Sequence, residues 1–172
     1  MTNEVLNVLE NRRSCREYRN EQIKDEELRT VLDAGLWAPT AMGTQDVIMI
    51  AVQDRKTIEK LSCLNAAVMN SSSDPFYGAP TVVVVLARPS ANDMVDGSGV
   101  MNYLMLAASS IGLGSCWINR AKEVFKEEEG KKLLKEWGVE GDWIGVGNCI
   151  LGYPVETAPK KPRKDGRVFY VR

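Results

Sequence analysis

The sequence predicts a mixed domain of α-helices and β-strands that pairs with a second copy of itself. Helical spacing of apolar residues alternates with short β-favouring runs, of which residues 81–87 are the clearest because they contain four consecutive valines. Residues 98–111 form a helical segment that is apolar on nearly all sides. A chain of 172 residues has difficulty burying such a helix alone, and packing it against its twin is the simple solution.

Two helices are expected at the start of the chain. Residues 3–10 have helical spacing, and their apolar side chains are expected to face inward: Val5, Leu6 and Leu9. A second helix is expected over 25–37, with Asp25 as its N-cap and Pro39 as the residue that stops it. Its apolar positions at helical spacing are Leu28, Val31, Leu32 and Leu36.

Two strands and a third helix follow. Residues 47–52 are apolar and favour β-structure, so they predict a buried strand. Residues 54–69 predict a helix whose apolar face contains Ile58, Leu61 and Leu64. The polar, serine-rich segment 70–80 predicts a loop, and the valine-rich run 81–87 predicts a core strand.

The apolar helix over 98–111 begins the second half of the chain and is expected to end at Gly112 and Gly114. Residues 116–118 predict a short strand, and residues 122–137 predict one charged amphipathic helix.

The last predicted strand covers 143–151. Two glycines are expected to break it: Gly145 and Gly147. The segment 154–164 is rich in proline and lysine and predicts an extended tail. Residues 167–171 predict an edge strand.

The composition is that of an ordinary globular protein, with 44% hydrophobic and 26% charged residues. The formal net charge of -1 gives no basic field that would attract nucleic acid or an anionic membrane. No apolar run is long enough to span a bilayer, and residues 1–10 lack the pattern of a signal peptide. The sequence therefore predicts a cytoplasmic protein.

The chain contains no histidine, and its four cysteines show no C-x-x-C spacing. These facts exclude histidine-containing zinc sites and serine–histidine or cysteine–histidine nucleophiles, and no metal site is expected. The cysteines are expected to be reduced thiols that pack as small hydrophobic residues. Acid–base chemistry near neutral pH must then fall to a perturbed carboxylate, lysine or thiol, or to a cofactor.

The first candidate binding segment is a basic turn that contains Arg12, Arg13, Ser14 and Arg16. Guanidinium groups this close together repel one another unless an anion or water separates them, and their forked donors suit phosphate. The alternative is a solvated turn that pairs with surface carboxylates.

A second basic segment, residues 160–164, lies in the tail. The alternative interpretation is a disordered basic tail. If both basic segments met at one anion, each would explain the other.

Two further loops are candidates. Residues 112–115, Gly-Leu-Gly-Ser, let backbone amides approach a ligand closely, or they simply terminate the apolar helix. Residues 38–45 form a small, polar turn before a predicted strand, which is either part of a site or an ordinary helix-to-strand connection.

These segments, in this order, resemble the FMN-dependent nitroreductase family. The motifs are Arg12-Arg13-Ser14-x-Arg16, Trp37-Ala38-Pro39-Thr40-Ala41-Met42 through Gln45, Gly78-Ala79-Pro80-Thr81 before the valines, Asn102-Tyr103-Leu104 through Trp117, and Gly152-Tyr153-Pro154 with 161–164. Each motif is short, and the specificity comes from finding all of them in order along nearly the whole chain.

The resemblance implies an α+β fold with a central, mainly antiparallel sheet flanked by helices, in an intertwined homodimer. Residues 1–172 would form a single FMN-binding domain whose tail, about 154–172, extends over the partner subunit. FMN would be the cofactor, and NADH or NADPH the reductant. The implied reaction is a ping-pong hydride transfer to a small electron-poor acceptor such as a nitroaromatic, a quinone or an enone, with no catalytic side chain.

The family's cofactor contacts can be carried over to matching positions. The FMN phosphate would be bound by Arg12, Ser14 and Arg16, with Arg13 nearby and with Lys161 and Arg163 closing on it. The flavin would be lined from the partner subunit by Pro39, Thr40, Met42 and Gln45. Its ring edge would meet Leu113, Gly114 and Ser115, with Asn102 on the helix beneath.

The chain departs from the family pattern at Gly43, where many relatives have an asparagine whose amide contacts the flavin. Thr44, Asp46 and Val47 also differ from the usual residues. These departures put the affinity and the potential of FMN in doubt. They keep open a flavin-binding storage or sensor protein with little turnover. A structural or partner-binding module without flavin is a third interpretation.

Overall fold

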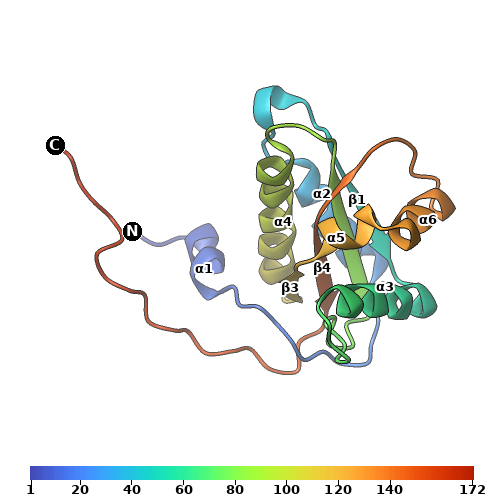
Figure 1. The fold of residues 1–172 in the computed structure, drawn as a ribbon. Coiled ribbons are helices and arrows are strands. Elements are labelled where there is room, and N and C mark those ends of the chain that lie inside the picture. Colours follow the sequence, from blue (N-terminus) through green and yellow to red (C-terminus); the bar gives the residue numbers. More distant parts are fainter.

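The computed structural model describes residues 1–172 and shows an antiparallel four-stranded sheet between two layers of helices (Figure 1). The strand order is β1-β2-β4-β3, with bounds β1 Val47–Val52, β2 Thr81–Ala87, β3 Gly114–Ile118 and β4 Ile144–Gly152. The helices are α1 Glu4–Asn11, α2 Asp25–Leu36, α3 Arg55–Val68, α4 Asp93–Ser110, α5 Ala121–Lys126 and α6 Glu128–Glu136, with a 3₁₀ turn η1 at Ala41–Gly43. The expected mixed fold with an antiparallel sheet is confirmed.

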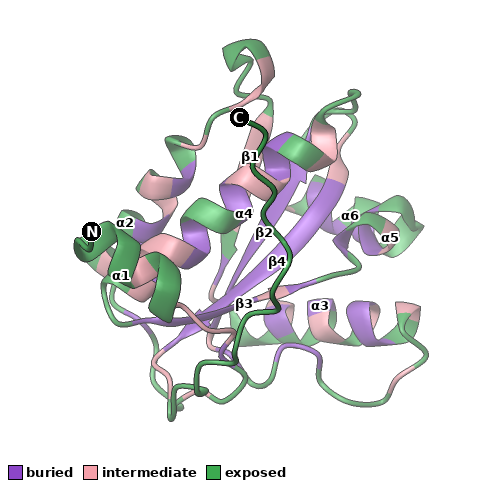
Figure 2. Ribbon diagram, turned by 90° about the vertical axis from the view of Figure 1, so that its left-hand side faces the viewer, coloured by how far each residue is buried: buried purple, intermediate pink, exposed green.

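Strand β2 is buried along its whole length and separates two hydrophobic cores (Figure 2). Alternate side chains point to opposite faces of a strand, so Val82 and Val84 pack toward α3, α5 and α6, whereas Val83 and Val85 pack toward α2 and α4. Burial on both faces explains the uninterrupted valine run that the sequence shows.

Strand β1 has the predicted bounds, but the prediction that it is buried is wrong. Residues 47–50 are half-buried and Ala51 is exposed. The reason is the position of β1 at the edge of the sheet, where only β2 pairs with it.

Helix α4 begins at Asp93, earlier than the predicted residue 98. Gly97 is a weak helix former, but an ideal Cβ there would lie 2.3 Å from a methyl carbon of Val146, so close packing on β4 requires glycine. Gly112, with φ 83°, follows the end of α4 as predicted. Gly114 is instead the first residue of β3, so its predicted role in ending the helix is wrong.

The predicted helix over 122–137 is two helices, because Glu127 between α5 and α6 is extended. Gly130 of α6 packs directly on the end of α5, where an ideal Cβ would lie 2.1 Å from the carbonyl oxygen of Val124. The close approach of these backbones breaks the helical pattern that the charged residues predict.

Strand β4 is continuous, so the prediction that its glycines break it is wrong. Val85 pairs with Gly147 and Leu86 pairs with Gly145, which leaves Val146 as an extra residue in β4. The two glycines therefore mark a β-bulge.

Helix α1 starts after Asn3, whose side-chain oxygen accepts a hydrogen bond from the backbone N–H of Leu6 at 2.9 Å. Its apolar residues do not face inward as predicted: Val5, Leu6 and Leu9 are 67%, 44% and 50% exposed. Figure 1 shows the reason, since α1 and both chain ends lie to one side of the sheet. Residues 167–171 form no strand and are exposed, because no strand of the same chain lies beside them.

None of the helices combines the length and the apolar character that crossing a membrane requires.

Helix α2 has Lys24 as its N-cap, so the prediction of Asp25 is wrong by one residue. The Glu27 side chain explains the shift, because it accepts a hydrogen bond from the Lys24 backbone N–H at 2.8 Å. The Tyr153 hydroxyl also donates to Glu27, at 2.6 Å, and ties the end of β4 to this helix. The Tyr153 hydrogen bond is the main cause that holds the pKa of Glu27 below its usual value.

The hydrogen bond from Tyr153 to Glu27 should make a pH-dependent contribution to stability. A carboxyl group whose pKa is lowered by folding stabilises the protein above its unfolded pKa, and that contribution is lost as the pH falls through the folded pKa. We expect Tyr153→Phe to lower the free energy of unfolding at neutral pH and to have a smaller effect once Glu27 is protonated. Urea unfolding at the two pH values measures both effects, and an equal loss at both would contradict a role for ionised Glu27.

Candidate functional site

The basic turn at residues 12–16 runs beside β3. Ser14 forms a parallel β-bridge with Ser115, and the backbone N–H of Cys15 donates to the Ser115 carbonyl at 2.9 Å. Gly114 allows this approach, because an ideal Cβ there would lie 2.8 Å from the Cys15 sulfur. The basic turn 12–16 and the glycine loop 112–115, two candidate segments of the sequence, therefore meet.

A small hollow of about 110 Å³ opens beside this bridge. Its lining includes four residues of the predicted site: Arg13, Ser14, Leu113 and Gly114. Residues 154 and 156–158, at the start of the tail, complete one side of it. The hollow thus joins the basic turn, the glycine loop and the beginning of the tail.

Four buried hydrogen-bonding atoms have no partner, and two of them belong to residues of the predicted site: Nη1 of Arg12 and Oγ of Ser115. The other two belong to Trp117 and Asn148. Burial raises the pKa of the Cys149 thiol to about 12, and the positive charge of Arg12 opposes this rise. Buried polar groups are nearly always satisfied, so an unpaired guanidinium nitrogen and an unpaired hydroxyl indicate places for hydrogen-bond acceptors.

The other two arginines of the turn point elsewhere. Nη1 of Arg13 donates to the carbonyl oxygens of Glu10 and Arg12, at 2.9 and 2.6 Å. The guanidinium carbon of Arg16 lies 5.9 Å from the centre of the exposed Tyr77 ring. The three guanidinium groups therefore do not converge on one point within this chain.

The basic tail lies along α1. Lys160 forms an ion pair with Glu10 at 2.8 Å, and Lys161 and Arg163 line an open hollow of about 520 Å³ together with Arg13. The structure therefore brings the two basic segments of the sequence to the same side of one chain.

Four predicted residues of the 38–45 segment lie at the opposite end of α4: Pro39, Thr40, Met42 and Gln45. The carbonyl oxygen of Pro39 lies 3.6 Å from the ideal Cβ position of Gly99, near the start of α4. From there to Ser109, which lines the small hollow, α4 rises about 15 Å. Asn102 is exposed on α4 about one turn beyond Gly99. These five residues are thus separated from the basic turn within one chain.

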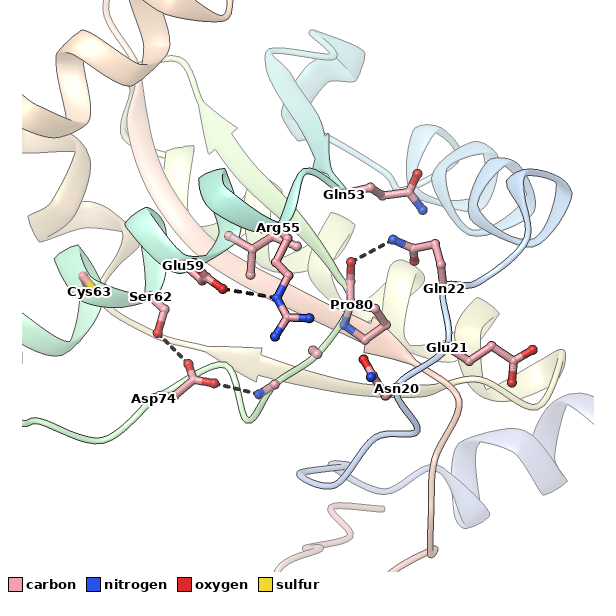
Figure 3. Close-up of a pocket in the computed structure, with 13 residues that line it drawn as sticks. Asn20, Glu21, Gln22, Gln53, Arg55, Glu59, Ser62, Cys63, Asp74 and Pro80 are labelled. Carbon is pink, nitrogen blue, oxygen red and sulfur yellow. Dashed lines mark hydrogen bonds and ion pairs between the residues drawn. The ribbon is translucent and has the colours of Figure 1, made fainter.

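A separate hollow of about 480 Å³ lies on the other side of the sheet, beside α3 (Figure 3). Its polar groups are largely bonded to one another. Arg55 pairs with Glu59 at 3.2 Å, and the Asp74 carboxylate accepts from the backbone N–H of Gly78 at 2.7 Å. None of the residues of the predicted site lines this hollow.

Comparison with known proteins decides the family. The model of the Nitroreductase family matches residues 9–75 and 64–153 of this chain. The chain belongs to the Nitroreductase family.

Relatives of this nitroreductase-family chain align along almost its entire length. A protein of Archaeoglobus fulgidus, named as an NADH dehydrogenase/NAD(P)H nitroreductase, is 32% identical over 97% of this chain and 90% of its own length. A Bacillus subtilis protein named FMN reductase [NAD(P)H] is 24% identical over 94% of this chain and 70% of its own length.

Solved structures show the same nitroreductase fold. A nitroreductase of Bacteroides fragilis with bound FMN superposes with a TM-score of 0.91 at 30% identity, covering 99% of this chain and all of that one. A nitroreductase of Desulfitobacterium hafniense with bound FMN also has a TM-score of 0.91, at 25% identity, with both chains covered completely. The resemblance to the family inferred from the five motifs is confirmed.

Sequence reasoning missed one residue that contacts the 38–45 segment. Asp96 of α4 accepts a hydrogen bond from the backbone N–H of Ala41 at 3.0 Å. The predicted helix began at residue 98, which left Asp96 outside it. An acidic residue in the first turn of a helix is a recognisable signal, but its partner far away in the chain is not.

Proposed function

We propose that this chain is an FMN-dependent NAD(P)H oxidoreductase. It reduces small electron-poor acceptors, such as nitroaromatics, quinones or enones, with NADH or NADPH in a ping-pong cycle. One observation carries the proposal: Arg12 and Ser115 carry buried donors without partners, and the residues next to them in the chain, Arg13, Ser14 and Gly114, line the small hollow beside the Ser14–Ser115 bridge. Membership of the Nitroreductase family, and FMN in the similar B. fragilis structure, support it.

The residues present fit a phosphate group at this place. The Arg12 guanidinium and the Ser14 hydroxyl offer donors, and charge-assisted bonds from arginine to phosphate are among the stronger hydrogen bonds in proteins. Lys161 and Arg163, on the same side of the chain as Arg13, add positive charge. The bonds from Arg13 to the carbonyl oxygens of Glu10 and Arg12, and the position of Arg16 over Tyr77, support a location of these two arginines at the edge of the site.

FMN, when bound, supplies the capacity to accept and donate hydride. The protein would hold and orient the ring through Leu113, Gly114 and Ser115, with Asn102 of α4 nearby. Backbone N–H groups of this loop would stabilise negative charge on the reduced ring. No side chain acts as a nucleophile, in keeping with a sequence that contains no histidine.

The position of the 38–45 segment supports a site built by two subunits. If α4 packs antiparallel on its twin about a two-fold axis, the start of one α4 lies beside the end of the other. Pro39, Thr40, Met42 and Gln45 of one subunit then face residues 113–115 of its partner. Exposed apolar side chains in these regions would be covered in such a homodimer: Trp37, Met42, Val95, Tyr103 and Ile111.

The tail belongs to the same proposal. Residues 1–172 act as one domain, and the tail 154–172 extends over the partner subunit, where the exposed Val168, Phe169 and Tyr170 become covered. The protein works in the cytoplasm and acts on small molecules, without nucleic acid or membrane as a partner.

Gly43 favours a second candidate function, a flavin-binding storage or sensor protein with little turnover. Its φ is +68° and nothing lies within 4 Å of its ideal Cβ position. The loop therefore has space for the asparagine that many relatives carry, and asparagine tolerates this backbone conformation. The chain lacks that amide contact with the ring although its backbone does not forbid it.

The visible spectrum of the purified protein tests the proposed function. We expect a yellow protein whose flavin band bleaches when NADH or NADPH is added without oxygen and recovers when an acceptor is added. Bleaching followed by steady oxidation of NAD(P)H supports the enzyme. Bound flavin without turnover favours the storage or sensor protein, and a colourless protein that takes up no FMN contradicts both.

A further inference from the structure

We propose that Asp96 is a positioning residue that fixes the segment 39–45 for flavin binding. This inference rests on the proposed function. Its carboxylate accepts a hydrogen bond from the Ala41 backbone N–H and so anchors the segment to the start of α4. Asp96 itself does not touch the flavin in this proposal.

The burial of Asp96 is the first reason. Its exposed fraction is 9%, and it forms no ion pair with any lysine or arginine of residues 1–172. A buried carboxylate without a cation is costly unless hydrogen bonds and favourable dipoles compensate. Its place in the first turn of α4 and the bond from Ala41 provide that compensation.

The rigidity of the helix beneath is the second reason. Gly97 lets this turn of α4 pack closely on Val146 of β4. Val146 lies in the buried part of that strand. Two residues further, the ideal Cβ position of Gly99 lies 3.6 Å from the carbonyl oxygen of Pro39. Asp96 and Gly99 are three positions apart, so they share one face of α4 and contact the segment at two points.

The conformation of the segment is the third reason. Met42, Gly43 and Gln45 have φ values of 53°, 68° and 57°, which are in the left-handed region. Non-glycine residues there are strained and keep this conformation only when their surroundings hold them. Met42 is 96% exposed, so packing within the chain does not hold it.

The hydrogen bonds of the segment single out Asp96. The amides of Gly43, Thr44 and Gln45 donate to acceptors inside the segment itself, at 3.0, 3.2 and 3.0 Å. The bond from Ala41 to Asp96 is the one hydrogen bond between residues 39–45 and the rest of the chain. It therefore decides where the whole strained turn sits, and with it the positions of Thr40 and Met42 against the flavin of the partner subunit.

The test compares Asp96→Ala, which removes the acceptor, with Asp96→Asn, which keeps an acceptor oxygen of the same shape. Asp93→Ala is the matched control, because it removes an acidic residue from the same first turn. Two quantities are measured on the full chain: hydrogen exchange of the Ala41 amide without flavin, and the dissociation constant for FMN.

We expect Asp96→Ala to speed exchange at Ala41 about 10- to 100-fold, the size expected for the loss of a hydrogen bond to a charged acceptor. The dissociation constant for FMN should rise about tenfold or more for the same reason. Asp96→Asn should have nearly the same Ala41 exchange rate and FMN dissociation constant as the original protein. Asp93→Ala should leave these two quantities unchanged.

Exchange at the Val146 amide, in the core of β4, separates positioning from folding. If Ala41 and Val146 speed up equally in Asp96→Ala, the residue supports the whole fold and the positioning role is wrong. Unchanged exchange at Ala41, or Asp96→Asn behaving like Asp96→Ala, also overturns it. If the original protein binds no FMN while its Ala41 amide is protected, the proposed function fails but the anchoring of the segment by Asp96 stands.

Discussion

Replacing both Arg12 and Arg163 with alanine is expected to weaken FMN binding by about 3–6 kcal/mol, because each charge-assisted hydrogen bond contributes about 1.5–3 kcal/mol. Arg12 carries the unpaired buried guanidinium nitrogen, and Arg163 lies on the same side of the chain next to Arg13. The double variant should therefore be purified without flavin and should remain colourless. Calorimetric titration of the flavin-free protein with FMN measures the change in affinity.

For the same double variant, we expect no loss in the stability of the flavin-free protein, although FMN binding is weakened. An unpaired guanidinium nitrogen inside the flavin-free protein costs free energy, so its removal should not destabilise that form. Urea unfolding without FMN checks this. Arg55→Ala is the control, since Arg55 is exposed and pairs with Glu59 beside the separate hollow. Unchanged affinity for FMN in the double variant would contradict the placement of the phosphate.

Replacing Gly130 with alanine is expected to lower the free energy of unfolding by about 2–3 kcal/mol, the cost of overpacking a well-packed interior. In an open helix the same change is stabilising by roughly 0.5–1 kcal/mol. The sign reverses here because the new Cβ would lie 2.1 Å from the carbonyl oxygen of Val124, and backbone atoms cannot move aside as a flexible side chain can. Urea unfolding measures the change.

Lys135→Ala is the control for this second variant. Lys135 is exposed in the same helix and forms no ion pair, so the free energy of unfolding should change by less than about 0.5 kcal/mol. If Gly130→Ala were as stable as the original protein, α5 and α6 would not be packed as closely as the structure shows.

The strands could be predicted well because their signal is local. Val47–Val52 and Thr81–Ala87 have the predicted bounds, since apolar β-branched runs bounded by polar residues encode a strand directly. The burial of β2 was also predicted correctly, but that of β1 was not, because it depends on which strand lies at the edge of the sheet. The same limit explains α1, whose apolar face is regular in the sequence but uncovered in this chain.

The break between α5 and α6 shows a different limit. Residues 122–137 have continuous helical spacing, and nothing local announces that Gly130 must pack against Val124. Tertiary packing overrides a weak local preference here. The start of α4 at Asp93 has the same explanation, because packing on Val146 selects glycine at position 97.

The sequence by itself determined the type of fold, the bounds of β1 and β2, and the family, because short motifs and apolar periodicity are properties of neighbouring residues. It also named the basic turn and the glycine loop as parts of a site. Only the tertiary structure decided that Ser14 lies against Ser115, that Arg12 turns inward, and that Asp96 holds the segment 39–45 at the far end of α4. These are contacts between residues far apart in the chain, and contacts of that kind are set by packing rather than by local propensity.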